Sequence, residues 1–183
     1  MNSAMIDLET LSLDPDACVV SIGVAIFNDE QVIEVKSWEL DMKYVNGHID
    51  PSTVAWWMHP DRDAARQATF GGSHSIFTAG YELKTLLATH NVEEVWANDP
   101  EFDLVVLKRW WMRNSEKGQL GDWPINYKWS RSFRTVMAEA QRLGHDTNQL
   151  RGFYIAHDAG EDAASQARAV IGARRMIRSG EAK

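Results

Sequence analysis

A nearly continuous nonpolar run covers residues 19–27 of the chain. Large aliphatic side chains alternate along it with the small residues Ser21, Gly23 and Ala25. A run of this length and composition is typical of a central strand that is covered on both of its faces. We therefore expect a helix to pack closely against the face that carries the small residues.

Four other segments predict strands around this central one. Residues 3–8 and 31–40 flank it, and the polar turn 28–30 separates it from the second of them. Two shorter segments, 92–97 and 125–129, have the strand pattern farther along the chain. The first three strands should form a meander.

Helical periodicity and helix start signals occupy most of the remaining chain. Asp50-Pro51 places an N-cap residue before a proline, which predicts the start of a short helix that Pro60 ends. Asp158 should cap the last helix, with Glu161 completing a capping box. Three further helices are predicted over residues 74–89, from Asp99-Pro100 onward, and over residues 132–143, with a polar loop at 144–154.

This order of elements predicts a single α/β domain over residues 1–183, with a mixed sheet and helices on its faces. The apolar fraction of 44% is that of an ordinary globular protein. The net charge of −7 argues against a protein that wraps long nucleic acid by charge alone. Because no run approaches the length of a membrane span, we expect no membrane association, and the single cysteine, Cys18, fits a reducing cytoplasm.

Acidic residues recur where the predicted strands and helices begin or end. Asp7 and Glu9 are two apart on a strand, so their side chains should share one face. Asp103 and Asp162 fall near the starts of helices, where carboxylates are favoured, and His157 precedes the last helix. Four carboxylates that converge repel one another unless cations neutralise them, and divalent metal ions with oxygen ligands are the usual solution.

These residues lie within three motifs that together span most of the chain. The motifs are Asp7-Leu8-Glu9-Thr10, Asn98-Asp99-Pro100-Glu101-Phe102-Asp103 and His157-Asp158-Ala159-Gly160-Glu161-Asp162. They resemble, in the same order, the three motifs of the DEDDh 3′→5′ exonucleases. Within that family the chain is most similar to the phage exonuclease A and RNase T-like branch, to which the Trp56-Trp57 pair adds weak support.

The resemblance implies a ribonuclease H-like fold and a metal-dependent 3′→5′ exonuclease that releases nucleoside 5′-monophosphates from single-stranded 3′ ends of RNA or DNA. It implies two Mg²⁺ or Mn²⁺ ions bound by Asp7, Glu9, Asp103 and Asp162. His157 would then be the general base for the attacking water. It also leads us to expect a homodimer.

Several residues around these motifs are candidates for binding substrate: Thr10, Leu11, Asn98, Trp57 and Arg134. In the resembled family, the stretch that corresponds to Thr10 and Leu11 lies against the terminal nucleotide. We expect Trp56 and Trp57 to serve the core or a subunit contact more than base stacking. Arg134 and its neighbour Arg131 could hold a phosphate or belong to a solvated helix face.

Two other functions are compatible with the same fold. A ribonuclease H-type endonuclease would share the metals, but such an enzyme would not explain the presence of His157 five residues before Asp162. A nucleic-acid-binding module without turnover is the second alternative, although an intact set of buried acids is costly to keep without metal. The length of the products from an end-labelled strand separates these three functions.

Overall fold

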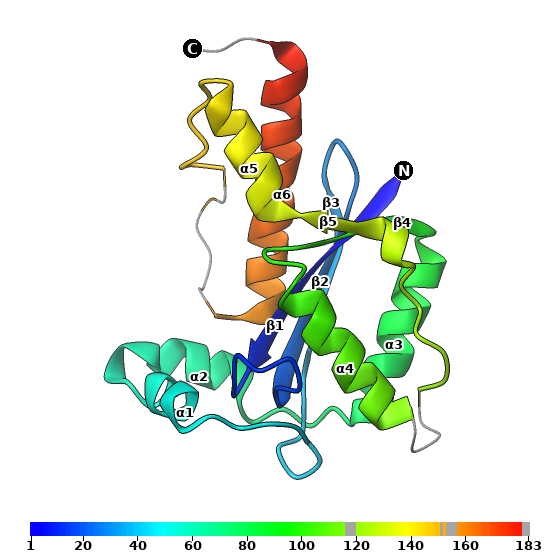
Figure 1. Ribbon diagram of the computed structural model, residues 1–183, viewed down its shortest axis with the longest axis vertical. Helices are drawn as coiled ribbons and strands as arrows, with labels where there is room; N and C mark the ends of the chain where they lie inside the picture. Colours follow the sequence, from blue (N-terminus) through cyan, green and yellow to red (C-terminus); the bar gives the residue numbers. More distant parts are fainter. Residues whose placement is uncertain (116–119, 151, 153–156, 181–183) are drawn as a thin grey trace.

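The structure is a computed structural model that describes residues 1–115, 120–150, 152 and 157–180. The polar loop predicted over 144–154 therefore lies partly outside the described residues. Within the described part, five strands form one sheet in the order β3-β2-β1-β4-β5 (Figure 1).

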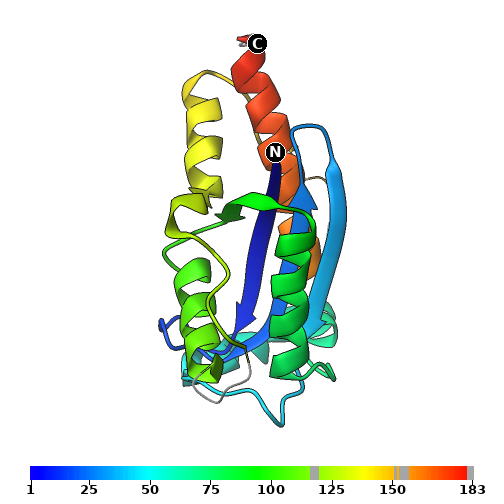
Figure 2. The ribbon, with the colours of Figure 1, turned by 90° about the vertical axis from the view of Figure 1, so that its right-hand side faces the viewer.

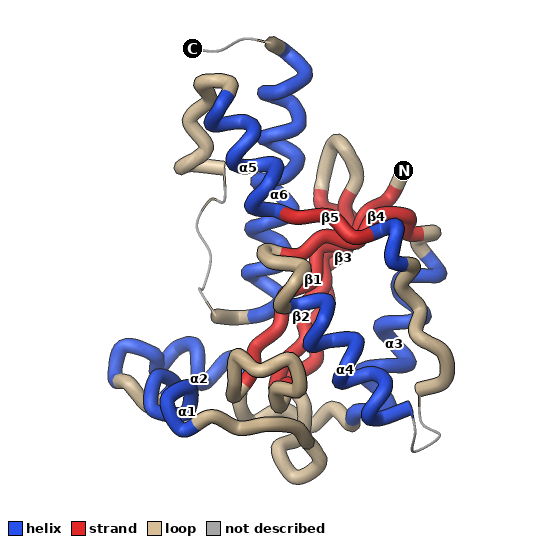
Figure 3. The backbone as a smooth tube through the Cα atoms, viewed as in Figure 1, coloured by secondary structure: helices blue, strands red, loops and turns tan. Residues whose placement is uncertain are grey.

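The sheet is mixed, as the sequence predicts. Strand β2 is antiparallel to both β1 and β3, whereas β4 is parallel to β1 and to β5. In Figure 3 the strands lie together at the centre of the molecule. Their bounds are β1 (Asn2–Thr10), β2 (Val19–Phe27), β3 (Val32–Glu39), β4 (Val92–Ala97) and β5 (Ser130–Ser132).

Helices cover both faces of the sheet, which gives three layers (Figure 1), and Figure 2 looks onto the side that carries α3 and α4. Helices α3 and α4 pack on one face, and α5 and α6 pack on the other. The helices are α1 (Pro51–Trp57), η1 (Pro60–Arg62), α2 (Asp63–Thr69), α3 (Ile76–Thr89), α4 (Asp103–Ser115), η2 (Tyr127–Trp129), α5 (Phe133–Arg142) and α6 (Ala159–Ser179). Among the described helices, none has both the length and the apolar character needed to cross a lipid bilayer.

Two of the predicted elements are wrong in their bounds. The helix expected from Asp99 begins at Asp103. Asp99 and the residues after it form a turn, in which the carbonyl oxygen of Asp99 accepts from the N–H of Phe102 at 2.9 Å. The strand expected over 125–129 is instead the three residues of β5, preceded by η2. So short a polar strand has no hydrophobic alternation to reveal it, and its pairing with β4 determines its position.

Close contact between β2 and α6 confirms the expectation for the small-residue face. A β-carbon added at Gly23 would lie 1.9 Å from the main-chain oxygen of Ala159, so only glycine allows this approach. Because Ala159 opens α6, this contact brings the first turn of that helix down onto the sheet. The position of Asp162 depends on it.

Candidate active site

Strand β1 directs two carboxylates toward the helix α6 side of the sheet. Met5 packs in the core with α6, whereas Ile6 and Leu8 pack in the core with α3 and α4. By alternation along the strand, Asp7 and Glu9 share the face of Met5. Glu9 is buried, and Asp7 is partly buried and accepts a hydrogen bond at 2.7 Å from the side-chain amide of Gln166.

The first turn of α6 carries the third carboxylate. Asp158 caps this helix as predicted, because its side chain accepts from the N–H of Glu161 at 3.0 Å. Asp162 follows on the buried side of the turn. Its Oδ2 atom accepts from the main-chain N–H of His157 at 2.6 Å, which ties the histidine to the carboxylate.

The fourth carboxylate, Asp103, opens α4 and is also buried. Its Oδ2 atom accepts from the main-chain N–H of Asp99 at 3.2 Å. Because β1 and β4 are parallel neighbours, with Ile6 paired to Ala97, the turn after β4 lies beside the end of β1. The second motif, with Asp103, therefore lies beside the first motif at the end of β1.

Burial and mutual repulsion raise the pKa values of these acids. Burial raises the pKa of Glu9 to about 8, and the charges of Asp162, Asp103 and Asp158 add to the effect. The pKa of Asp7 lies well above its usual value, chiefly through burial and then through the charges of Asp103, Glu9 and Asp162. Burial also raises the pKa of Asp103 to about 7. The structure therefore brings the four predicted carboxylates into one electrostatic cluster.

Part of this cluster has the spacing of a metal site. Among the described residues, Glu9, His157 and Asp162 each offer a ligand atom, and these atoms lie within 4.8 Å of one another. Asp7 and Asp103 add two further carboxylates. The charge of Asp103 raises the pKa of both Glu9 and Asp7. An oxygen-rich set of this kind suits hard divalent cations such as Mg²⁺ and Mn²⁺.

His157 stands at the edge of the cluster in an unusual backbone conformation, with φ of +65°. Burial lowers the pKa of its imidazole, and the nearby charge of Arg62 lowers it further. A depressed pKa keeps the ring neutral near pH 7, so that it can accept a proton. The ring of Trp56 contacts it edge-to-face, with ring centroids 4.8 Å apart.

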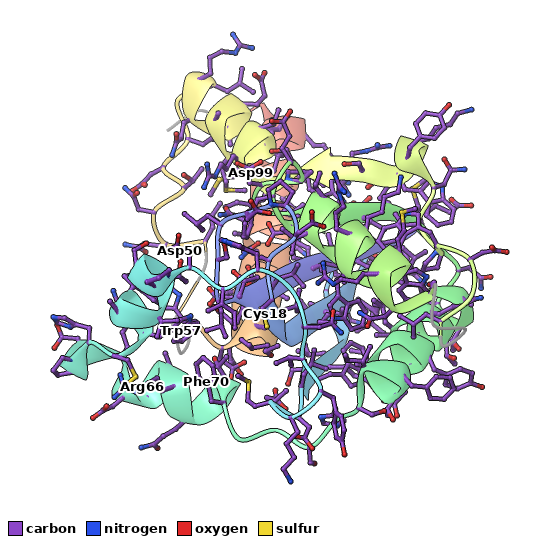
Figure 4. The ribbon with its side chains drawn as sticks, turned by 60° about the horizontal axis from the view of Figure 1, so that its bottom comes forward. Cys18, Asp50, Trp57, Arg66, Phe70 and Asp99 are labelled. Carbon is purple, nitrogen blue, oxygen red and sulfur yellow. The ribbon has the colours of Figure 1, made fainter. Side chains whose placement is uncertain are left out.

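A cavity of about 380 Å³ opens beside Glu9. Its lining comes from the end of β1, from helix α1 and from the second motif: Leu8, Glu9, Thr10, Leu13, Ser52, Thr53, Trp56, Trp57 and Phe102. Trp56 is 38% exposed and Trp57 only 3%, so the first of the pair offers more surface to a ligand. Figure 4 shows Trp57 beside Phe70, and their ring centroids are 5.1 Å apart.

The remaining predicted substrate residues are placed differently from one another. Thr10 lines the cavity, but Leu11 does not: it is buried in a cluster with Cys18 and Trp57. The pairing of β1 shifts between Glu9 and Thr10, and the strand ends at Thr10, so Leu11 does not continue the alternation of Asp7 and Glu9. A role for Leu11 in substrate binding stays a prediction.

The second motif and α5 carry the last two candidates. Asn98 is half-buried just after β4, and Arg134 is exposed and forms an ion pair with Asp99 at 3.4 Å. Arg131 forms an ion pair with Glu94 at 3.1 Å, so its guanidinium group stabilises the sheet edge.

Sequence reasoning missed two side chains that contact this site. Gln166 lies four residues after Asp162, and this spacing puts both on one face of α6, so the periodicity could have revealed it. Thr69 donates a hydrogen bond to the carbonyl oxygen of His157 at 3.0 Å across 88 residues of sequence. Nothing in the local pattern signals that contact.

Comparison with known proteins identifies the family of this chain. The family model described as the 3′-5′ exoribonuclease Rv2179c-like domain matches residues 2–172. Among curated proteins, no significant match was found.

Solved structures share the fold at low sequence identity. The nuclease domain of 3′hExo, a DEDDh family member bound to rAMP, superposes with a TM-score of 0.59 at 12% identity, over 98% of this chain and 92% of that one. E. coli Exonuclease I in complex with an oligonucleotide gives a TM-score of 0.57 at 14% identity, over 97% of this chain but only 40% of its own. These similarities confirm the ribonuclease H-like fold class. The family model spans nearly the whole sequence, so the chain belongs to the Rv2179c-like 3′-5′ exoribonuclease domain family and is a 3′-5′ exonuclease.

Proposed function

We propose that this exonuclease trims single-stranded RNA from its 3′ end with two divalent metal ions and a histidine base. The observation that carries the proposal is the approach of Glu9, His157 and Asp162 within 4.8 Å, beside a cavity lined by aromatic rings. The family description, which names an exoribonuclease, supports RNA over DNA.

Asp7, Glu9, Asp103 and Asp162 are the residues that would hold the metal, as Mg²⁺ or Mn²⁺. When bound, a pair of such ions stabilises the attacking and leaving oxygens of a phosphodiester displacement. The raised pKa values of Glu9 and Asp103 express how strongly the cluster favours added positive charge, whether protons or cations.

His157 is suited to remove the proton from the attacking water. Its lowered pKa leaves the ring unprotonated near neutral pH, and its main-chain N–H is held by Asp162 at 2.6 Å. A general base must be within hydrogen-bond reach of the proton it removes. The close approach of His157 to Glu9 and Asp162 gives it access to a water beside the acids.

The cavity beside Glu9 is suited to one terminal nucleotide. Trp56 and Phe102 offer rings for stacking on a base, which tolerates any sequence. Ser52 and Thr53 also line it, and the hydroxyl group of Thr53 is a candidate partner for a ribose 2′-OH, the group that distinguishes RNA from DNA. Because the chain has a net charge of −7, we expect specificity to come from this cavity rather than from an extended contact with phosphates.

Two further expectations stay predictions. A homodimer is still expected, but Trp57 cannot form its contact, because Trp57 is buried and its indole N–H donates to the carbonyl oxygen of Thr10 at 2.9 Å. A cytoplasmic location rests on the single buried cysteine, Cys18.

The first prediction concerns stability without metal. Because the pKa of Glu9 is about 8 when folded and 4.5 ordinarily, the folded state keeps a proton that the unfolded state loses between these values. Stability in EDTA should therefore fall as pH rises from about 4.5 to about 8. Urea denaturation across this range should show a shallower fall for Glu9→Gln. The exposed Glu93→Gln control should match wild type. If stability falls equally steeply with pH in all three proteins, the charge of Glu9 does not destabilise the folded state.

The second prediction concerns His157. His157→Ala should lower kcat by roughly 10²–10⁴, the usual contribution of a positioned general base. Calorimetric titration should show Mn²⁺ affinity close to that of the wild type. His90→Gln, which removes a histidine that pairs with Glu34 on another part of the surface, should leave both quantities unchanged. If Mn²⁺ binding collapses in His157→Ala, this histidine is a metal ligand and the assigned role is wrong.

The third prediction tests the proposed function as a whole. With 5′-labelled strands of one sequence and Mn²⁺, we expect single-nucleotide ladders from single-stranded RNA and slow trimming of a blunt duplex, whose end must first unpair. A 3′-phosphate should block attack, and Asp103→Asn should be inactive on every strand. Internal cleavage of the blocked strand would instead indicate an endonuclease, and no cleavage of any strand would indicate a binding module. Faster trimming of DNA than RNA would reverse the assignment of substrate.

A further inference from the structure

His157 adopts a backbone conformation that its side chain does not favour. Its φ of +65° lies in the left-handed region, which a residue with a β-carbon rarely adopts. Such a conformation persists only where the surrounding structure imposes it. The contacts that hold His157 are therefore part of the site.

Two hydrogen bonds hold the main chain of His157, one on each of its peptide groups. The N–H donates to Oδ2 of Asp162 at 2.6 Å, which ties it to α6. The carbonyl oxygen accepts from the hydroxyl group of Thr69 at 3.0 Å, which ties it to the end of α2. Thr69 is 1% exposed and is not among the residues that line the nucleotide cavity.

Two aromatic rings of α1 contact the imidazole. The ring of Trp56 lies 4.8 Å from that of His157 at an interplanar angle of 85°, and the ring of Trp57 lies 6.4 Å away. The guanidinium carbon of Arg62 lies 4.4 Å from the centroid of Trp56, which adds a cation–π contact to this group. Helices α1 and α2, with η1 between them, thus contact both the ring and the main chain.

The same helices are fixed to the strand that carries Glu9. The indole N–H of Trp57 donates to the carbonyl oxygen of Thr10 at 2.9 Å, and the Trp57 ring packs against Phe70, the residue after Thr69. In Figure 1, α1 and α2 lie beside the end of β1 and the start of α6. Movement of α2 would therefore change the distance between His157 and Glu9.

We propose that Thr69 is a positioning residue for catalysis: its hydroxyl group holds His157 in the left-handed conformation that presents the imidazole to the carboxylates. The inference rests on the proposed role of His157 as the base. Without the hydroxyl, the His157 carbonyl loses its partner on α2, and the backbone is free to return to a negative φ. The ring then moves away from Glu9 and Asp162 while the carboxylates stay in place.

The test compares three variants of the full chain on single-stranded RNA with Mn²⁺. Thr69→Val removes the hydroxyl and keeps the shape, and it should lower kcat at least tenfold, about 1.4 kcal/mol in the barrier, with KM nearly unchanged. Thr69→Ser keeps the hydroxyl and should restore most of the rate. Thr85→Val is the matched control, because the Thr85 hydroxyl donates to the carbonyl oxygen of Tyr81 at 2.8 Å within α3. It should behave as wild type.

A double-mutant cycle separates this inference from the proposed function. In a His157→Ala background, Thr69→Val should cause no further loss, because both changes act through one imidazole. An inactive His157→Ala beside a fully active Thr69→Val would overturn the positioning role alone. An active His157→Ala would overturn the base assignment itself.

A measurement that does not depend on activity addresses the fold of the variants. Amide hydrogen exchange should accelerate at His157 in Thr69→Val and not in Thr69→Ser, while the core strands keep their protection. Equal loss of rate in Val and Ser variants, or unchanged exchange at His157 in Thr69→Val, would contradict the inference. General loss of protection in the core would also contradict it, because Thr69 would then support the fold rather than the histidine.

Discussion

The repulsion among four converging carboxylates is the constraint on which the rest of this molecule depends. Burial and neighbouring acids raise the pKa values of Asp7, Glu9 and Asp103. The charged forms of these groups are therefore less stable in the folded chain than in water. A fold selected only for stability would place basic side chains among them. Here the core supports the acids, and divalent cations are the usual means of neutralising such a cluster.

Packing, rather than charge, brings these acids together. Alternation along β1 directs Asp7 and Glu9 toward α6, and the absence of a side chain at Gly23 lets the first turn of α6 approach the sheet. Parallel pairing of β1 with β4 then brings Asp103 to the same edge. Large hydrophobic cores on both faces of the sheet compensate for the electrostatic cost of this arrangement.

The sequence predicts those parts of the site that depend on local periodicity. Asp7 and Glu9 share a face because strand alternation is a short-range rule. Their convergence with the helix-start acids was expected from the resemblance of the three motifs to those of the DEDDh exonucleases. The burial of Leu11 away from the cavity was not predicted, because a shift in pairing ends that alternation just before it. Thr69 could not be found, because its contact with His157 depends on tertiary packing between segments 88 residues apart. Such contacts have no periodic signature.

The most direct test of the account is to locate the cations themselves. Anomalous diffraction from crystals grown with Mn²⁺ should show two ions about 3.5–4 Å apart among Asp7, Glu9, Asp103 and Asp162, the spacing of two-metal phosphodiesterase sites. The imidazole of His157 should face the pair without binding either ion. Crystals in which Mn²⁺ binds elsewhere, or in which the four carboxylates remain together at neutral pH with no cation between them, would contradict the central claim.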